Sequence, residues 1–197
     1  MSLVLYYSPM SSAVTAHWAL EELGIPYDKV KIDLVARDQD KAAFLTLNPN
    51  GKVPLLVHDG VPIFESAAIM IHLGETFGVD KKLFPGPGLA RAEAIKWLVW
   101  CNVSVGEALS RYLHSTSPRV PEERHNAKAG EVAQADVEKL LGILENALEA
   151  KQWLVGDAFT LTDLHVSGWI SYVGMCGFEL ARWPKVEAWA KRAASRP

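Results

Sequence analysis

Two adjacent serines near the start of the chain, Ser11 and Ser12, are the residues best placed to do chemistry. They follow an apolar run at residues 3–7 and a turn, and apolar residues then recur at helical spacing. At such a helix N-terminus, free backbone N–H groups and the positive end of the helix dipole favour an anion. A hydroxyl that donates to a thiolate contributes about 1.5–3 kcal/mol, enough to lower a thiol pKa from about 8.5 by roughly one to two units. The turn therefore suits a bound thiolate, and helix capping alone is the alternative.

A serine hydrolase is disfavoured, because the pattern G-x-S-x-G is absent and no His-Asp relay lies near either serine in sequence. We therefore expect a hydroxyl donor rather than a nucleophile at this turn.

A second polar pair, Glu65-Ser66, stands where another predicted helix begins. The Ser66 hydroxyl and the first free amides of that helix can bind a carboxylate, while Glu65 can face an ammonium group. Together they suit the head group of an α-amino acid, with ordinary capping as the alternative.

The first part of the chain alternates strand and helix patterns. Strands are predicted at 3–7, 30–34, 53–57 and 61–64, and helices at 11–23, 41–47 and 65–77. The order is β-α-β-α-β-β-α. The following segment, GVDKKLFPGPG, has the glycine and proline content of a linker.

Everything after the linker has a helical pattern. Helices are predicted at about 89–114, 122–150 and 160–174, with a last one from Pro184. Thr160 and Asp163 form a capping box, with Phe159 before it as a hydrophobic staple. We expect three parts: residues 1–77, a linker at 78–88, and an all-helical domain at 89–197.

Five segments resemble glutathione S-transferases, in order and at the spacing of that family. They are L-Y-Y-S-P-M-S-S, A-L-E-E-L-G-I-P-Y, L-N-P-N-G-K-V-P-L-L, F-E-S-A-A-I and F-T-L-T-D. The resemblance covers nearly the whole chain and is closest to the cytosolic, bacterial-like type. It implies an α/β thioredoxin-like N-terminal domain that binds glutathione, followed by an all-α helical bundle.

The resemblance also assigns a glutathione site. It implies that Val53 pairs through its backbone with the cysteinyl part of glutathione, which a cis bond to Pro54 makes possible by turning that backbone outward. Lys52 is a candidate for binding a carboxylate, and Glu65 and Ser66 hold the γ-glutamyl end.

The reactive position has two candidates. Aligned on Pro9, serine-type members of the family place their hydroxyl nearest Ser11, whereas the bacterial cysteine-type pattern places its cysteine at Ser12. Ser11 is favoured. Tyr6 and Tyr7 resemble the early tyrosine of other members, but strand residues in this position more often pack in a core.

The implied activity is conjugation of reduced glutathione to a small hydrophobic electrophile, in detoxification, by a homodimer. Reduced glutathione is then a co-substrate, and no other cofactor is expected. The alternatives are a non-catalytic glutathione-binding or interaction module and a glutathione-dependent reductase or peroxidase. The absence of cysteine where the first helix begins argues against the reductase.

Composition narrows the partners. The 23 acidic and 20 basic residues are interspersed and give a net charge of −3, so no nucleic-acid partner is expected. Two cysteines outside any C-x-x-C spacing fit a cytoplasmic protein, and no stretch is long and apolar enough to predict a membrane span. The six histidines lack metal-ligand spacing, so no metal is assigned. Candidates for the electrophile pocket are Trp97, Trp100, Tyr112 and Trp169.

Overall fold

A computed structural model describes residues 1–196, and its first part has the predicted order of elements. These are β1 (Leu3–Tyr7), α1 (Ala13–Leu23), β2 (Asp28–Lys31), α2 (Ala42–Leu47), β3 (Leu55–His58), β4 (Val61–Phe64) and α3 (Ser66–Leu73). A 3₁₀ turn, η1 (Asp38–Asp40), precedes α2, and a π turn, η2 (Gly74–Gly78), extends α3.

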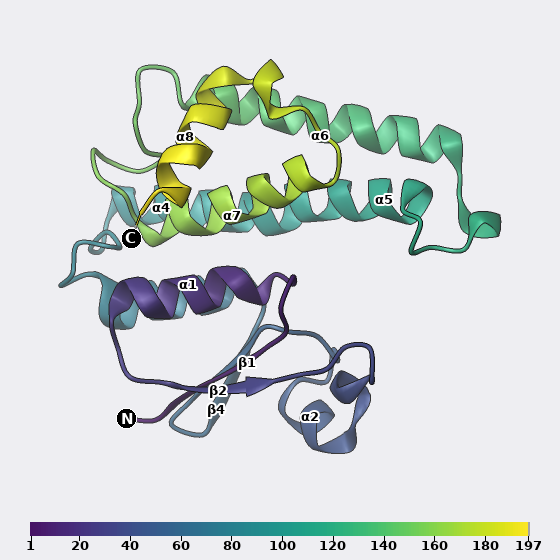
Figure 1. Cartoon of the computed structure of the whole chain (residues 1–197). Coiled ribbons are helices and arrows are strands. Elements are labelled where there is room, and N and C mark those ends of the chain that lie inside the picture. The colour runs from purple at the N-terminus through teal and green to yellow at the C-terminus, as the bar shows by residue number, and fades with distance from the viewer. Residues whose placement is uncertain (197) are drawn as a thin grey trace.

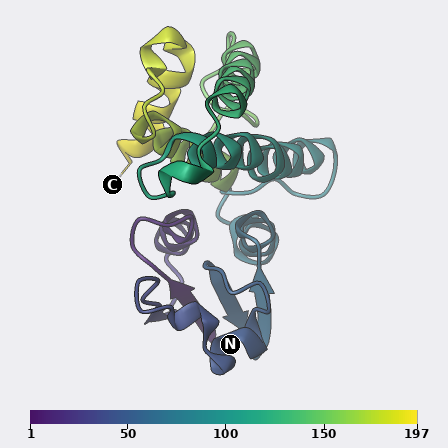
Figure 2. The same ribbon diagram turned by 90° about the vertical axis from the view of Figure 1, so that its right-hand side faces the viewer.

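The four strands form one sheet in the order β2-β1-β3-β4. β1 pairs with β2 in parallel and with β3 in antiparallel fashion, and β3 and β4 form an antiparallel hairpin. α1 and α3 cover the face of the sheet that is turned toward the helical part, and α2 lies away from that part (Figure 1, Figure 2). This is the predicted thioredoxin-like arrangement.

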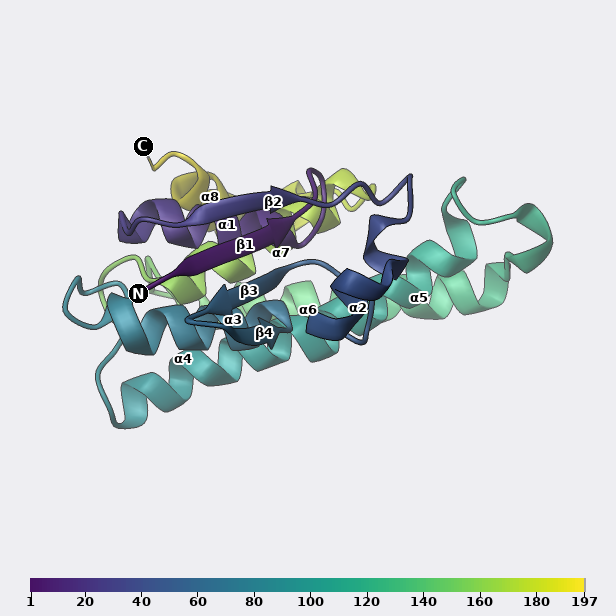
Figure 3. The same cartoon turned by 90° about the horizontal axis from the view of Figure 1, so that it is seen from below.

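The second part is entirely helical within the described residues. Its helices are α4 (Leu89–Trp100), α5 (Gly106–Thr116), α6 (Ala127–Ala147), α7 (Leu161–Met175) and α8 (Pro184–Ala194), with single turns η3 (Cys101–Val105), η4 (Glu122–Arg124) and η5 (Leu180–Arg182). η3 is a π turn that joins α4 to α5 without a break, so the three follow one line below the sheet in Figure 3. Up to residue 196, no helix is long and apolar enough to cross a membrane.

Several element boundaries differ from the sequence prediction, and two of the differences have a clear physical reason. The second strand ends at Lys31 rather than at residue 34, because Ile32 already turns into the small core around Phe44 and Leu34 is exposed. The predicted helix at 122–150 is split: Asn126 caps α6 by accepting from the Ala129 N–H at 3.0 Å, so the preceding residues form only a short turn.

α7 joins the two parts of the chain. Residues 161–167 of α7 are all buried, and its first turn carries the predicted capping box, in which the Thr160 N–H donates to Asp163 at 3.0 Å. Asp163 also accepts from the indole N–H of Trp189 in α8, at 3.0 Å. The larger of two apolar cores runs from the sheet through α1 and α3 into these helices. The helical part therefore packs on α1 and α3, the helices that begin at the candidate site.

Candidate functional site

The segments predicted to bind a ligand meet at one edge of the sheet. Tyr6 of β1 pairs with Leu55 of β3, and Leu55 pairs with Phe64 of β4. The end of β1, the start of β3 and the end of β4 therefore lie side by side. The turn before α1, the segment before β3 and the start of α3 emerge together from that edge, and two helix N-termini face it.

The turn before α1 is held by its own backbone and by Ser11. Met10 has a positive φ of 56°, which reverses the chain there. The Ser11 hydroxyl donates to the Ser8 carbonyl at 2.7 Å and accepts from the Ala13 N–H at 3.2 Å. Its hydrogen is thus already used inside the turn, and its oxygen caps the helix.

Ser12 is held more loosely. Its hydroxyl donates to the Val53 carbonyl at 3.4 Å, the upper limit of hydrogen-bond length, and the side chain is half-buried. The contact brings the turn next to the segment before β3.

The segment before β3 is fixed by Asn48, which is 2% exposed. The side-chain amide of Asn48 donates to the Lys52 carbonyl at 2.7 Å. The backbone carbonyl of Asn48 accepts from the N–H of Gly51, which has a positive φ of 59°. The Lys52 side chain is exposed. The Val53–Pro54 bond is cis, as the resemblance implies, and Val53 precedes the paired residues of β3.

Glu65 and Ser66 differ in exposure. Glu65 is exposed and has a φ of 69°, a left-handed conformation that costs free energy in a residue with a side chain, and such conformations cluster at functional sites. Ser66 is only 4% exposed, and its oxygen accepts from the amide of Asn102 at 2.9 Å.

A chain of buried polar groups continues from Asn102. The Asn102 carbonyl oxygen lies 2.7 Å from Nε2 of His165, and Nδ1 of His165 lies 3.2 Å from the Thr15 hydroxyl. The Thr15 hydroxyl in turn lies 3.1 Å from the Ser12 carbonyl. Burial lowers the pKa of His165 to about 3, so the ring is neutral at pH 7.

Sequence reasoning missed this chain of contacts. Asn102 belongs to no motif, and His165 is one of the six histidines for which the sequence assigns no role. Asn102 lies in η3, a π turn, and π turns are frequent at functional sites. A π turn cannot be recognised from the sequence, so this signal appears only in the structure.

Of the four aromatic candidates for an electrophile pocket, Trp169 follows the residue of α7 that packs against α1, and its own ring lies against Gly106, where an added Cβ would be 3.4 Å from it. The preceding residue, Gly168, packs so closely on Thr15 that an added Cβ would lie 2.6 Å from its methyl group. The other three are engaged among themselves or with the core: Trp97 packs edge-on against Trp100, and Tyr112 against Phe178.

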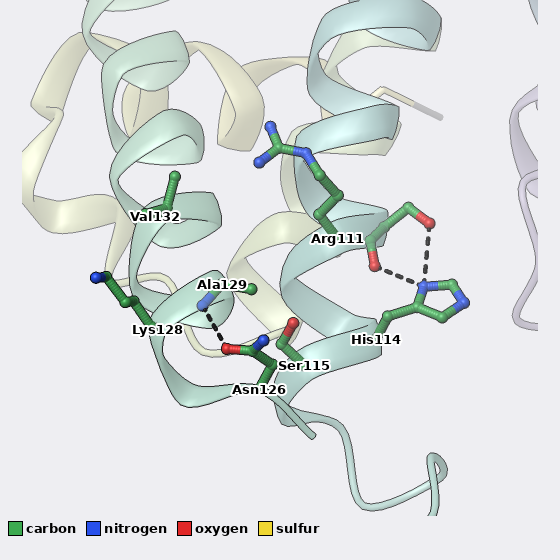
Figure 4. Close-up of a pocket in the computed structure, with 8 residues that line it drawn as sticks. Arg111, His114, Ser115, Asn126, Lys128, Ala129 and Val132 are labelled. Atoms are coloured by element: carbon green, nitrogen blue, oxygen red, sulfur yellow. Dashed lines mark hydrogen bonds between the residues drawn. The ribbon is translucent and has the colours of Figure 1, made fainter. Parts of the chain in front are cut away.

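A surface pocket elsewhere belongs to the helical part (Figure 4). It lies between α5 and α6, and its lining includes Arg111, His114 and Lys128. Arg111 is already paired with Glu107 at 2.6 Å and with Asp136 at 2.8 Å, and Nδ1 of His114 lies 2.8 Å from the Ser110 carbonyl. The pocket is therefore weakly suited to an anion and is separate from the edge of the sheet.

Among residues 1–196, no group of three or more His, Cys, Asp or Glu side chains could hold a metal ion. The closest histidine pair is His58 and His72, whose ring nitrogens lie 2.8 Å apart.

The fold is thus a thioredoxin-like unit joined to a helical bundle, with hydroxyl groups at the edge of the sheet. A model of the glutathione S-transferase N-terminal domain matches residues 1–75, and one of the C-terminal domain matches residues 107–197. The chain belongs to the glutathione S-transferase family. The predicted fold class and family are confirmed, and the predicted enzyme class, glutathione transferase, is that of the family.

Relatives of two kinds are similar to the chain. Glutathione S-transferase GstB of Escherichia coli (strain K12) is 31% identical over 180 residues, covering 90% of this chain and 86% of the relative. Disulfide-bond oxidoreductase YfcG of the same strain is 29% identical over 203 residues, covering 98% and 90%.

Solved structures agree with this fold. A glutathione S-transferase from Xanthobacter autotrophicus Py2 is 31% identical with a TM-score of 0.83, covering 100% of this chain and 94% of that one. Yeast Ure2p in complex with glutathione is 25% identical with a TM-score of 0.90, covering 100% and 95%.

Proposed function

We propose that the protein conjugates reduced glutathione to small hydrophobic electrophiles, with a serine at the turn before α1 stabilising the glutathione thiolate. The observation that carries this proposal is the contact between Ser12 and Val53, 3.4 Å long, which joins the candidate thiolate donor to the candidate site of the cysteinyl group. A hydroxyl in this position can leave a long, weak bond and donate to sulfur at little cost.

We propose Ser12 as that donor and Ser11 as the residue that holds the turn. The Ser11 hydroxyl donates to Ser8 over 2.7 Å, a short bond that it would have to give up before it could donate to sulfur. The family resemblance favours Ser11, so Ser11→Ala and Ser12→Ala are the two variants to compare. Tyr6 and Tyr7 are the next candidates.

The rest of the site binds the tripeptide. Val53 and Pro54 present a backbone to the cysteinyl part, and Lys52 is exposed beside them for a carboxylate. Glu65 faces the γ-glutamyl ammonium, and Ser66 donates to the γ-glutamyl carboxylate. The left-handed backbone of Glu65 supports this role, because such strain is retained where it positions a group for function.

The electrophile binds on the helical side of the turn, where Trp169 supplies an aromatic surface. The packing of Gly168 on Thr15 supports this position to the extent that it sets this part of α7 against α1, the helix that follows the turn. Reduced glutathione is the co-substrate, and no further cofactor is proposed.

A homodimer is proposed as well. β4 is an edge strand with exposed apolar side chains at Val61 and Phe64. Val99 of α4 and Val103 of η3 are exposed as well. These elements lie on the same side of the molecule (Figure 3). We propose that residues 1–77 of one chain pair there with the helical domain, 89–197, of the other, and that 78–88 is the linker. We also propose a role in detoxification, and a cytoplasmic location, which the two free cysteines support.

A glutathione-dependent disulfide reductase is the second candidate, and similarity to the oxidoreductase YfcG favours it. Burial raises the pKa of both cysteine thiols, Cys101 and Cys176, so a reductase here would use glutathione sulfurs alone. The third candidate is a non-catalytic binding module.

One assay separates these functions. Purified protein with reduced glutathione is given an aryl halide, a peroxide and a small disulfide in parallel reactions. Thioether formation is expected to exceed the uncatalysed rate. Turnover of only the disulfide or the peroxide would favour the reductase or peroxidase, and binding without any turnover would favour the binding module.

A further inference from the structure

The buried polar chain between the two halves of the site has a direction set by its hydrogen atoms. The Asn102 carbonyl oxygen has no hydrogen, so Nε2 of His165, 2.7 Å away, must carry the proton. Because burial keeps this ring neutral, Nδ1 is then an acceptor, and the Thr15 hydroxyl lies 3.2 Å from it.

The other end of the chain acts on Ser66. The Asn102 amide donates to the Ser66 oxygen at 2.9 Å, so Ser66 is an acceptor within the protein. Its own hydrogen is left to donate to something else. With the side chain 4% exposed, little water competes for that hydrogen. A hydroxyl that accepts one bond also becomes a stronger donor of the next.

We propose that Asn102 and His165, both from the helical part, are positioning residues that hold the Ser66 hydroxyl as a donor to the γ-glutamyl carboxylate. The proposal rests on the proposed glutathione site. His165 orients the Asn102 amide, and Asn102 orients the hydroxyl. The single hydrogen of the Thr15 hydroxyl serves either Nδ1 of His165, 3.2 Å away, or the Ser12 carbonyl, 3.1 Å away, so the continuous set of bonds runs from Ser66 through Asn102 to His165.

This arrangement gives the helical part a role in binding glutathione. The ligand-facing residues lie in the first 66 residues, but the orientation of one of them depends on a side chain from η3. Alternative rotations of the Asn102 amide would present an oxygen to Ser66, turn the hydroxyl inward and remove its bond to the ligand. The His165 tautomer with its proton on Nε2 selects against that rotation, because this N–H needs the Asn102 oxygen as its acceptor.

The test is a double-mutant cycle measured by calorimetry of reduced glutathione binding. Asn102→Ala is expected to weaken binding about 3- to 10-fold, and Asn146→Ala, at an exposed asparagine of α6, less than about 2-fold. In a Ser66→Ala background, Asn102→Ala is expected to add less than about 2-fold, because the hydroxyl it orients is gone. A merely structural role would give the same loss in both backgrounds.

Two further variants guard against misfolding and test the second link. Asn102→Leu fills the same space without a donor and is expected to match Asn102→Ala. His165→Gln retains an amide N–H and is expected to bind more tightly than His165→Leu. Equal affinity in the parent and Asn102→Ala, or additive losses in the cycle, would overturn the proposal. A parent that does not bind glutathione at all would instead remove the proposed function, and this inference with it.

Discussion

Two helices begin at the same edge of the sheet, each with a hydroxyl, and they hold that hydroxyl in different ways. Before α1, Ser12 is half-buried and makes one long contact of 3.4 Å. At the start of α3, Ser66 is 4% exposed and accepts a bond of 2.9 Å from a side chain that is itself held by His165. The first hydroxyl is free to turn toward a new partner, and the second is fixed. Ionisation of a bound thiol and binding of the tripeptide should therefore be separable by mutation.

The largest expected effect is on turnover, from Ser12→Ala. Loss of the donor to the thiolate should raise the bound thiol pKa and lower the conjugation rate at neutral pH about 10- to 100-fold, as a charged hydrogen bond of about 1.5–3 kcal/mol predicts. The dissociation constant of glutathione should change less than about 3-fold. Initial rates with an aryl halide, beside calorimetry, measure both quantities. A rate equal to that of the parent would mean that the donor lies elsewhere.

The next effect is on affinity, from Glu65→Ala. Removing the carboxylate that faces the ammonium should weaken glutathione binding about 10-fold or more, because charge-assisted bonds are the strong ones. The bound thiol pKa should stay within about half a unit of the parent. Glu131→Ala, at an exposed glutamate of α6, is the control. Equal affinities in the parent and Glu65→Ala would contradict this half of the comparison.

A third effect concerns the histidine behind the fixed hydroxyl. Burial lowers the pKa of His165 from 6.5 to about 3, so between these values the unfolded chain binds a proton that the folded chain does not. The free energy of unfolding therefore decreases as the pH is lowered below 6.5. Between pH 7 and pH 5, protonation of His165 in the unfolded chain should lower this free energy by about 2 kcal/mol.

His165→Gln should lack that part of the loss. Urea denaturation of the parent and the variant at both pH values measures the difference. The same pH dependence in both proteins would show that the histidine is not held neutral.

The smallest effect should come from Ser11→Ala. Its hydroxyl accepts from the Ala13 N–H and donates to the Ser8 carbonyl, so its loss should lower the free energy of unfolding by about 1 kcal/mol, as loss of a helix cap does. The conjugation rate should stay within about 3-fold of the parent. If instead Ser11→Ala slows conjugation and Ser12→Ala does not, the alignment with serine-type family members is the better guide.

Sequence reasoning was strongest where local chemistry decides the structure. The strand periods, the turn residues and the capping box at Thr160 and Asp163 act over a few positions, so the element order and the start of α7 were readable. The second strand was predicted at 30–34 and lies at Asp28–Lys31. The alternation of apolar and polar residues there does not reveal where pairing with β1 begins and ends.

The candidate site was predictable only in part, for a physical reason. The resemblance supplied the residues that face a ligand, and these remain predictions. Asn102 and His165 come into contact across 63 positions of the sequence, through the packing of η3 against α7, which no local pattern encodes. The choice between Ser11 and Ser12 depends on which hydroxyl already has a partner, and that too appears only in three dimensions.

The central claim is that the turn before α1 stabilises a thiolate, and the most direct test is the pKa of glutathione bound to the unaltered protein. Thiolate absorbance of the complex, measured against pH and compared with glutathione alone, gives this value. We expect a pKa roughly one to two units below that of the free thiol, near neutral pH. A bound thiol that titrates at the same pH as free glutathione would contradict it.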